Sequence, residues 1–372
     1  MDFELTDDQL ELQRTVRDVL AQECPPDLVR AVTEGGAADE LWDTLVSLDW
    51  PGLTIATEHG GTGYSWVELA IVLEEFGRAV APGPFLATVT QFASAVRAVA
   101  TPHQASHWLP LVASGAVTGA FAVDEGAGTW LLDGVSAAAT CDGEDLVLAG
   151  TKRYVLDGAT ADEIAVVVRL DAQLRVVVVP RSALGVDAFA PIDATSVHAD
   201  LDLDGCRVPV DRLLGEGDAT EAISAAIDEA LVAISVSTVG TCQRILELDV
   251  EYAKERRQFD VPIGSFQAVK HKLADMYRDV ERARALSYFA ALCLAEGDSR
   301  AAVAASMAKA AAGECQQRCT QDGLQIFGGI GYTWEHDLHL YLRRAKVGEL
   351  TFGGASQHRQ RVARLTLAGG LA

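Results

Sequence analysis

The spacing of hydrophobic and polar positions changes twice along the chain, and these changes predict three domains. Residues 1–115 repeat apolar positions at helical spacing and predict an N-terminal α-helical domain. Short apolar runs of strand length fill residues 116–215 and predict a central, mostly antiparallel β-domain with solvent on one face. Long helical patterns return over residues 216–372 and predict an antiparallel four-helix bundle. The expected fold class is therefore α+β, with the domains in the order α, β, α.

Local signals support each zone. Thr6 and Gln9 have the spacing of a capping box, which predicts that a helix begins there. Two continuous apolar runs, 164–168 and 176–179, have the length of strands. The last zone holds three stretches that are almost free of glycine and proline, at 222–254, 269–296 and 301–327. Because the faces of long bundle helices often serve as subunit interfaces, we expect an oligomer.

Composition and charge limit the ligands and the cellular setting that the sequence predicts. The chain has 372 residues and a formal net charge of −23, which argues against binding nucleic acid over a broad surface but leaves room for one basic pocket that holds a phosphorylated ligand. No apolar run reaches about 18 residues, so no membrane span is expected. The N-terminus lacks a signal-peptide pattern. Seven cysteines without a CxxC pair indicate a reducing, cytoplasmic setting. Cys315 and Cys319 lie four apart without a histidine or carboxylate spaced to complete a site, so no metal is expected.

The segment 255–267 is the first candidate for ligand binding. Arg256 closes a predicted helix, and Phe266 and Gln267 begin the next one after a break that contains proline and glycine. Arginine fits a pyrophosphate through paired hydrogen bonds, and glutamine can donate and accept at the edge of a ring. The alternative is that the arginine complements a helix dipole and the phenylalanines belong to the core. The segment alone leaves both interpretations open.

The segment 325–332, Gln-Ile-Phe-Gly-Gly-Ile-Gly-Tyr, is the second candidate. Its glycines expose backbone N–H groups and admit a ligand close to the chain. A dinucleotide-binding fingerprint is a poor explanation, because no strand precedes the segment and the spacing is GGxG. Taken alone, the segment is better explained as the glycine cap of a long helix.

Together, the two segments resemble the acyl-CoA dehydrogenase family of flavoproteins. The order RRQF, a short break, FQ and then, well further along the chain, QIFGGIGY is typical of that family, and LTDDQLELQRTVRDVL and RRAKVGELTFGGASQHRQRVAR fall in the family's order near the two ends of the chain. The resemblance implies an α-helical domain, a β-domain and a helical bundle. It also implies that FAD oxidises an acyl-CoA to the trans-2-enoyl-CoA while a glutamate removes the α-proton, with electron-transfer flavoprotein as the expected acceptor.

In dimers of this family, one FAD spans two chains. The bundle of one subunit holds the ADP part, and the β-domain and C-terminal segment of its neighbour hold the isoalloxazine. The resemblance implies that this chain keeps the residues for the ADP part, which are Arg256, Phe259, Ile263, Phe266, Gln267, Gln325, Gly328 and Gly329. Arg256 corresponds to the pyrophosphate arginine.

The residues for the chain's own isoalloxazine depart from the family's pattern. The usual Thr-Glu-Pro-x-x-Gly-Ser-Asp becomes residues 124–130, which begin with Asp124 and end with Trp130, and Trp-Ile-Thr becomes residues 154–156. Asp124 would repel an anionic reduced flavin by up to about 4 kcal/mol at ~4 Å. The two positions where the family places its catalytic glutamate hold Phe352 and Ala230, neither of which can abstract a proton.

Three functions remain open. The first is a subunit without a catalytic base that pairs with a base-bearing paralogue, resembling the α2β2 heterotetrameric acyl-CoA dehydrogenases of bacterial steroid side-chain β-oxidation. The second is a homotetrameric dehydrogenase whose base is an unassigned acid, with Glu229 and Glu349 nearest to the two positions. The third is a non-catalytic binding protein on the same fold. Steroid, branched and fatty acyl-CoA substrates are all open.

Overall fold

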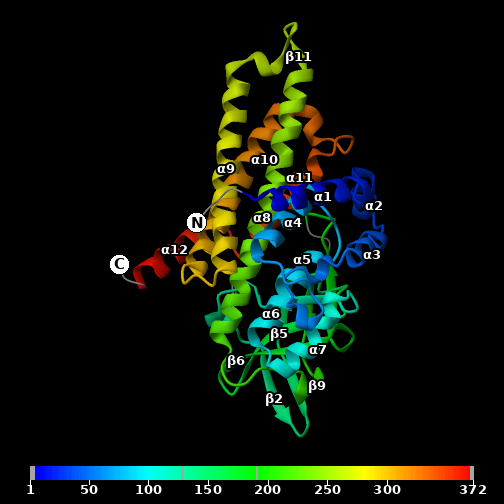
Figure 1. Cartoon of the computed structure of the whole chain (residues 1–372), viewed down its shortest axis with the longest axis vertical. Coiled ribbons are helices and arrows are strands. Elements are labelled where there is room, and N and C mark those ends of the chain that lie inside the picture. Colours follow the sequence, from blue (N-terminus) through cyan, green and yellow to red (C-terminus); the bar gives the residue numbers. More distant parts are fainter. Residues whose placement is uncertain (1–4, 127–129, 190–191, 369–372) are drawn as a thin grey trace. The chain divides into compact units, whose positions relative to one another are not determined.

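The computed structural model describes residues 5–126, 130–189 and 192–368, and its elements follow the predicted order α, β, α (Figure 1). The α+β fold class is confirmed. The chain divides into two compact units: one comprises residues 1–36, 66–81 and 231–372, and the other comprises residues 37–65 and 82–230.

The first unit is helical. Within the described residues its helices are α1 (Asp7–Glu23), α2 (Pro26–Thr33), α4 (Trp66–Ala79), most of α8 (Thr220–Glu255), α9 (Gln267–Ala295), α10 (Ala301–Phe327), α11 (Leu338–Leu350) and α12 (Ala355–Ala368). The expected capping box starts α1, where the Gln9 amide N–H donates to Thr6 Oγ1 over 3.3 Å and the Thr6 N–H donates to Gln9 Oε1 over 3.0 Å. The three long helices expected from the sequence match α8, α9 and α10 to within two residues at each end.

The second unit contains the β-sheets. Its elements are α3 (Asp39–Ser47), α5 (Phe85–Ala87), α6 (Ala93–Val99), α7 (Pro102–Ala113), β1 (Gly119–Ala122), β2 (Ala138–Asp142), β3 (Asp145–Ala149), β4 (Thr151–Leu156), β5 (Glu163–Leu170), β6 (Gln173–Pro180), β7 (Gly185–Phe189), β8 (His198–Asp202), β9 (Arg207–Pro209), β10 (Leu213–Leu214) and the first turns of α8. Among the described residues, one sheet has the order β10-β6-β5-β2-β3-β9, with β1 also paired to β5, and a second has the order β4-β8-β7. Most pairs are antiparallel, but β5 pairs in parallel with β1 and β2.

The expectation of one solvent-exposed face is wrong for the centre of the large sheet. Residues 164–168 of β5 and 174–179 of β6 are buried without alternation. A continuous run of valines places apolar side chains on both faces of a strand, so both faces must be covered. The alternation is retained in β8, where Leu201 is buried and Asp202 is exposed.

Helix α8 is long, apolar and mostly buried. By length and composition it could cross a membrane, but 78% of its most apolar window is buried inside the protein. A buried core helix has the same composition, so its apolar character follows from packing.

Helices α4 and α8 cross at very short range. A Cβ atom on Gly240 of α8 would lie 1.8 Å from the Glu74 carbonyl oxygen, and one on Gly77 of α4 would lie 1.8 Å from the Ser237 carbonyl oxygen. The Thr241 hydroxyl also donates to the Gly77 carbonyl over 2.9 Å. Only glycine permits this backbone contact, which sets the position of α4 on the bundle.

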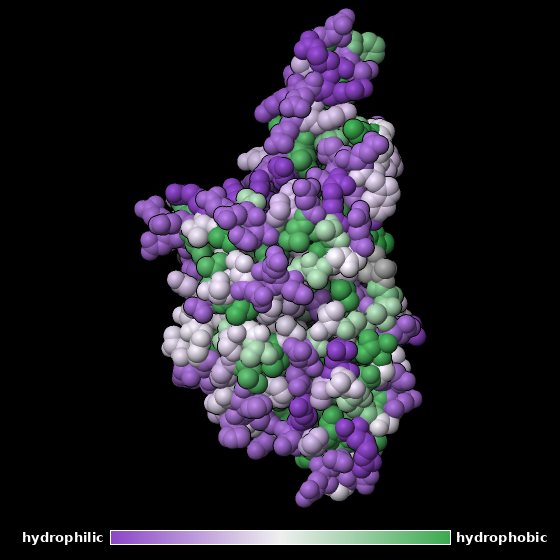
Figure 2. Space-filling view, turned by 90° about the vertical axis from the view of Figure 1, so that its right-hand side faces the viewer, coloured by the Kyte–Doolittle hydropathy of each residue, from purple (hydrophilic) through white to green (hydrophobic). Residues whose placement is uncertain are grey.

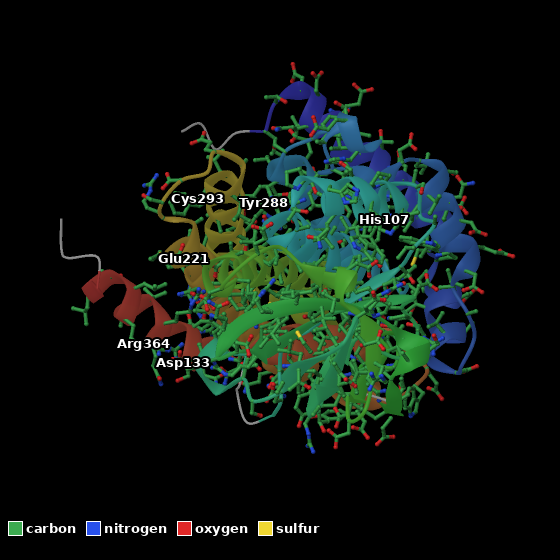
Figure 3. The ribbon with its side chains drawn as sticks, turned by 90° about the horizontal axis from the view of Figure 1, so that it is seen from below. His107, Asp133, Glu221, Tyr288, Cys293 and Arg364 are labelled. Carbon is green, nitrogen blue, oxygen red and sulfur yellow. The ribbon has the colours of Figure 1, made fainter. Side chains whose placement is uncertain are left out.

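The same crossing buries a carboxylate. Glu74, on α4, accepts hydrogen bonds from Arg284 Nε and from the Tyr288 hydroxyl, both over 2.9 Å. Tyr288 lies on α9 (Figure 3). A polar link therefore joins α4 to α9 beside the glycine contact.

We expect Gly240→Ala to destabilise the protein by about 3 kcal/mol or more, because its new methyl group cannot fit against the backbone of α4. Urea unfolding measures the loss. Gly329→Ala is the matched control, because a Cβ there meets nothing within 4 Å. Equal stabilities of the two variants would contradict the close crossing.

Candidate functional site

The first predicted binding segment forms a hairpin between two long helices. Helix α8 ends at Glu255, and the short strands β11 (Arg257–Gln258) and β12 (Val261–Pro262) pair before α9 begins at Gln267. The hairpin stands at the top of Figure 1. Its two turn residues, Phe259 and Asp260, have φ of +52° and +63°, the conformation of a tight turn between two strands. The Arg257 guanidinium closes the turn by donating to the Asp260 carbonyl over 2.6 Å.

The phenylalanines of this hairpin do not belong to the core. Phe259 is 87% exposed and Phe266 is 39% exposed, and their rings meet edge to face at 6.2 Å. Figure 2 shows the end of the bundle as mostly hydrophilic with hydrophobic atoms at its tip. The interpretation that these phenylalanines belong to the core is therefore wrong. Two exposed aromatic rings on a charged hairpin are typical of a surface that another molecule covers.

The arginine of the hairpin is also exposed. Arg256 follows the last residue of α8, and its N–H donates to the Tyr252 carbonyl over 2.8 Å. Among the described residues, no carboxylate lies within ion-pair distance of its guanidinium. Its charge is thus available to an anion.

The second predicted segment ends α10. The helix stops at Phe327, and Gly328 takes φ +63° and ψ −138°, a conformation that favours glycine, before a 3-10 turn over Gly328–Tyr332. The cap function expected for these glycines is present. It does not explain Gly329, whose φ is not positive and whose Cβ would meet nothing within 4 Å. Gly329 therefore leaves open space that this chain does not use.

An aromatic stack brings the two segments together. The rings of Tyr252, in the last turn of α8, and Phe327, at the end of α10, stack 4.4 Å apart with an interplanar angle of 19°. Phe327 also contacts the ring of His336 at 4.5 Å. The stack places two segments that are distant in the sequence at one end of the bundle.

All eight predicted cofactor-binding residues lie in these two segments of one unit. Most of their side chains are exposed, while Ile263 and Gly328 are half-buried. The exposed guanidinium, the aromatic rings and the space beside Gly329 fit a phosphate-linked aromatic ligand such as the ADP part of FAD.

The stretch that would face an isoalloxazine is organised around a buried ion pair. Lys152 Nζ, fully buried, contacts Glu125 Oε1 at 2.6 Å and donates to the Val123 carbonyl over 3.2 Å. Burial lowers the pKa of Lys152 despite this partner. Trp130 is buried, and residues 127–129 lie outside the described residues. Asp124 accepts a hydrogen bond from the Gly126 N–H over 2.7 Å. These contacts hold the segment through its own side chains.

Phe352, predicted to occupy the commoner base position of the family, lies in a loop held by hydrogen bonds to its carbonyls. Phe352 follows α11 and has φ +53°, which is a strained conformation for a bulky residue. Lys309, fully buried on α10, donates from Nζ to the carbonyls of Glu349 and Gly353, each over 2.8 Å. His358 Nε2 lies 2.8 Å from the Phe352 carbonyl, so this nitrogen carries the hydrogen. Burial lowers the pKa of Lys309 to about 7 and that of His358 to about 3.

The neighbouring acids are engaged in ion pairs. Ala230, the other base position, is fully buried within α8 and offers no titratable group. Glu229, beside it, contacts Arg97 Nη2 at 2.5 Å. Glu349 contacts Lys346 Nζ at 2.8 Å. Both acids thus have the surroundings of structural side chains.

The structure also brings together residues that the sequence keeps far apart. Cys242, on α8, joins Cys315 and Cys319 of α10 in one buried group. Sequence spacing could not reveal this, because Cys242 lies on another helix, with the whole of α9 between it and the other two in the chain. All seven cysteines are free, as expected without a disulfide framework.

Comparison with known proteins identifies the family. The model "Acyl-CoA dehydrogenase, N-terminal domain" matches residues 6–116, and "Acyl-CoA dehydrogenase, C-terminal domain" matches residues 220–367. The acyl-CoA dehydrogenase IpdE2 of Mycobacterium tuberculosis is 32% identical, over 90% of this chain and 89% of its own length. The chain belongs to the acyl-CoA dehydrogenase family. Members of this family normally bind FAD and oxidise a CH–CH bond of an acyl-CoA.

Two solved structures of acyl-CoA dehydrogenase relatives are similar over nearly the whole chain. The ChsE4-ChsE5 complex of Mycobacterium tuberculosis has a TM-score of 0.91 at 29% identity and covers 100% of both chains. A G363A variant of the Tcur3481-Tcur3483 steroid ACAD has a TM-score of 0.88 at 28% identity and covers 98% of this chain and 99% of its own. Each of these structures has two named components.

Buried Lys309 and its hydrogen bonds to the carbonyls of Glu349 and Gly353, here called the Lys309 clamp, predict that the stability of the protein depends on pH. The pKa of Lys309 is about 7 in the folded chain, against about 10.4 for lysine in an unfolded one. The unfolded chain therefore binds more protons between these values, and the free energy of unfolding rises with pH across them. The variant Lys309→Met lacks the titrating group and should not show this rise. The free energy of unfolding of the natural chain minus that of the variant should therefore increase by about 2–3 kcal/mol from about pH 7.5 to 9.5.

Urea unfolding at the two pH values measures this change. Lys346→Met is the control, because Lys346 is 44% exposed in its pair with Glu349. A Lys309→Met difference that is the same at both pH values would contradict a buried, titrating clamp.

Proposed function

We propose that this chain is a subunit of an FAD-dependent acyl-CoA dehydrogenase complex and supplies the ADP-binding half of a flavin site to a base-bearing paralogue. The observation that carries the proposal is a contrast between two parts of one unit. The end of the bundle has an exposed arginine, exposed aromatic rings and an open glycine, whereas the loop after α11 holds Phe352, at the position where the resemblance places the family's acid.

Each of the predicted residues at the end of the bundle has its own role in binding FAD. The guanidinium of Arg256 binds the pyrophosphate through charge-assisted hydrogen bonds. Phe259, Ile263 and Phe266 cover apolar surface of the cofactor. The amides of Gln267 and Gln325 bind at polar edges, and Gly328 and Gly329 let the backbone approach. A bound FAD would supply the hydride acceptor for the β-carbon of the acyl-CoA, and a base on the partner chain would take the α-proton.

Each FAD site is built from parts of two chains, and the way these parts combine favours a heteromer. In a homodimer, every site would combine one intact half with one that lacks an acid. In a heterodimer, one site combines two intact halves and the other combines two eroded ones. We therefore propose an α2β2 heterotetramer that holds two FAD. The two-component composition of the ChsE4-ChsE5 and Tcur3481-Tcur3483 structures supports this proposal by similarity.

The substrate class rests on a weaker likeness. The Tcur3481-Tcur3483 protein is described as a steroid ACAD, and we propose a steroid side-chain acyl-CoA for the complex. We further propose electron-transfer flavoprotein as the acceptor and the cytoplasm as the location, the latter because every cysteine is free.

A second function has one observation in its favour. Glu349 lies three residues before Phe352, and its Oε1 lies 2.6 Å from the place where a Cβ of Gly354 would stand. A homotetrameric enzyme could use this acid as its base. Its ion pair with Lys346 and the hydrogen bond that its carbonyl accepts from Lys309 favour a structural role.

Arg256→Ala tests the proposal in the complex co-expressed with a base-bearing acyl-CoA dehydrogenase. We expect FAD affinity to fall about tenfold to hundredfold and activity to fall with it, although Arg256 lies on the chain without a base. Gly329→Ala should do the same by filling space that the cofactor needs. Flavin absorbance after gel filtration measures both effects.

Arg14→Ala, which removes an exposed arginine of α1, is the matched control and should keep its flavin. Full retention of FAD by both Arg256→Ala and Gly329→Ala would contradict the proposed function.

A further inference from the structure

Three cysteines from two helices meet in the interior of the bundle. Cys242 of α8 and Cys315 and Cys319 of α10 are all fully buried. The Sγ atoms of Cys315 and Cys319 are 3.8 Å apart, and the three sulfur atoms all lie within 4.8 Å of one another. Within the described part of the chain, no histidine or carboxylate joins them at this range.

The separation of the Cys315 and Cys319 sulfur atoms matches the distance between two sulfur ligands on one metal ion, and the third sulfur lies within 4.8 Å of both. A zinc–sulfur bond is about 2.3 Å long, so two thiolates on one ion stand about 3.8 Å apart in a tetrahedral site and about 4.0 Å apart in a trigonal one. Cys315 and Cys319 already have this separation, because residues four apart on a helix lie on one face. Cys242 adds the third sulfur from the facing helix.

The three thiols of the cluster interact with one another. Hydrogen bonds from the thiols of Cys242 and Cys319 lower the pKa of Cys315, whereas the pKa values of Cys242 and Cys319 are raised. Asp279 and Arg282 act on the pKa of Cys315 with opposite signs, and Asp249 raises the pKa of Cys319.

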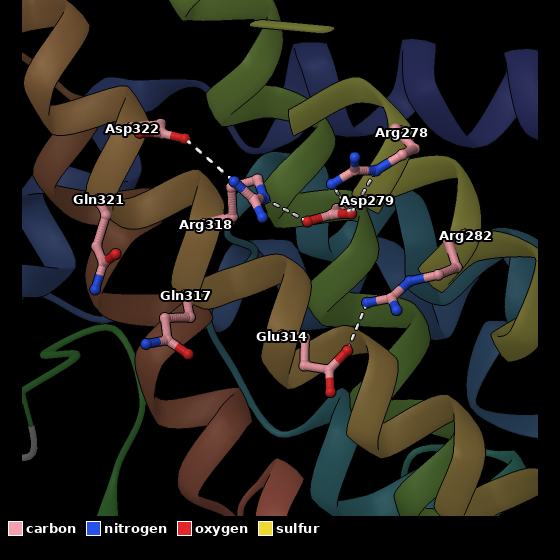
Figure 4. Close-up of a pocket in the computed structure, with 8 residues that line it drawn as sticks. All are labelled: Arg278, Asp279, Arg282, Glu314, Gln317, Arg318, Gln321 and Asp322. Carbon is pink, nitrogen blue, oxygen red and sulfur yellow. Dashed lines mark hydrogen bonds and ion pairs between the residues drawn. The ribbon is translucent and has the colours of Figure 1, made fainter. Parts of the chain in front are cut away.

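A charged pocket lies on the same bundle. It has a volume of about 470 Å³ and lies between α9 and α10, where it is lined by Arg278, Asp279, Arg282, Glu314, Gln317, Arg318, Gln321 and Asp322 (Figure 4). Glu314 and Arg318 directly precede Cys315 and Cys319 in the chain. Ion pairs from Arg282 to Glu314 at 2.6 Å and from Arg318 to Asp279 at 2.5 Å cross the pocket.

We propose that Cys242, Cys315 and Cys319 form a three-cysteine site for a soft metal ion of low coordination number. Thiolate ligands select copper(I) and zinc(II) over hard cations. Zinc(II) held by three thiolates would leave the cluster with a net charge of −1, the displaced protons passing to solvent. Copper(I) held by two thiolates and one thiol would leave the same charge and release one proton fewer. The site is independent of flavin binding.

Metal uptake by the full-length chain tests the site. The purified, reduced chain is incubated with Zn²⁺, Cu⁺ or Mg²⁺, passed through a desalting column and assayed for bound metal by atomic emission. We expect about one Zn²⁺ or Cu⁺ per chain and no Mg²⁺, with the number of protons released distinguishing the two soft ions. Bound metal should also raise the melting temperature.

Cys242→Ser, Cys315→Ser and Cys319→Ser should each lower the retained metal at least tenfold. Cys293→Ser is the control, because Cys293 is a fully buried cysteine of α9 outside the cluster (Figure 3). Where a serine variant does not fold, X-ray absorption of the metal-loaded natural chain decides, and three sulfur neighbours at about 2.3 Å support the site.

Three results would overturn the proposal. The first is a chain that retains no soft metal. The second is equal retention by the cluster variants and Cys293→Ser. The third is an absorption spectrum with only nitrogen and oxygen neighbours, which would place the ion elsewhere on the surface.

Discussion

The stack of Tyr252 on Phe327 is the contact on which the candidate binding surface depends. It joins the last turn of α8 to the last residue of α10, and the residues expected to hold the ADP part of a flavin lie in the hairpin between α8 and α9, at the start of α9 and at the end of α10. Aromatic pairs at this range contribute about 0.5–1.5 kcal/mol beyond the area they bury. The stack thus helps to hold the hairpin after α8 near the glycines after α10.

The exposure of that surface gives it functional meaning. Phe259, at the turn of the hairpin, is 87% exposed, and Arg256 in the same segment is also exposed. Apolar area and positive charge therefore lie in water. Both are stabilised when an aromatic, anionic ligand covers them. The loop around Phe352 differs, because buried Lys309 and His358 bind its carbonyls. The chain thus combines an exposed surface that fits a cofactor with a loop held by buried side chains.

The sequence predicted the long helices and the order of helical and β segments, because those depend on local periodicity and on breaks at glycine and proline. It also singled out the two candidate binding segments, since the residues of each lie close together in the chain, and their role in binding stays a prediction. It left open whether Phe259 and Phe266 are core or surface, because exposure depends on the hairpin that α8 and α9 form together. Cys242 could not be grouped with Cys315 and Cys319, since only the packing of α8 on α10 joins them. The positive φ of Phe352 and the Lys309 clamp arise from contacts between α10 and the distant loop after α11, so they leave no local signature.

The ratio of flavin to protein tests the division of labour most directly. This chain is produced alone and together with a base-bearing acyl-CoA dehydrogenase, and FAD is measured against protein after gel filtration. The expected result is a colourless chain alone and a yellow complex with about one FAD for every two chains. A solitary chain that holds one FAD per polypeptide and oxidises an acyl-CoA would contradict the idea that its reactive flavin ring lies in another subunit.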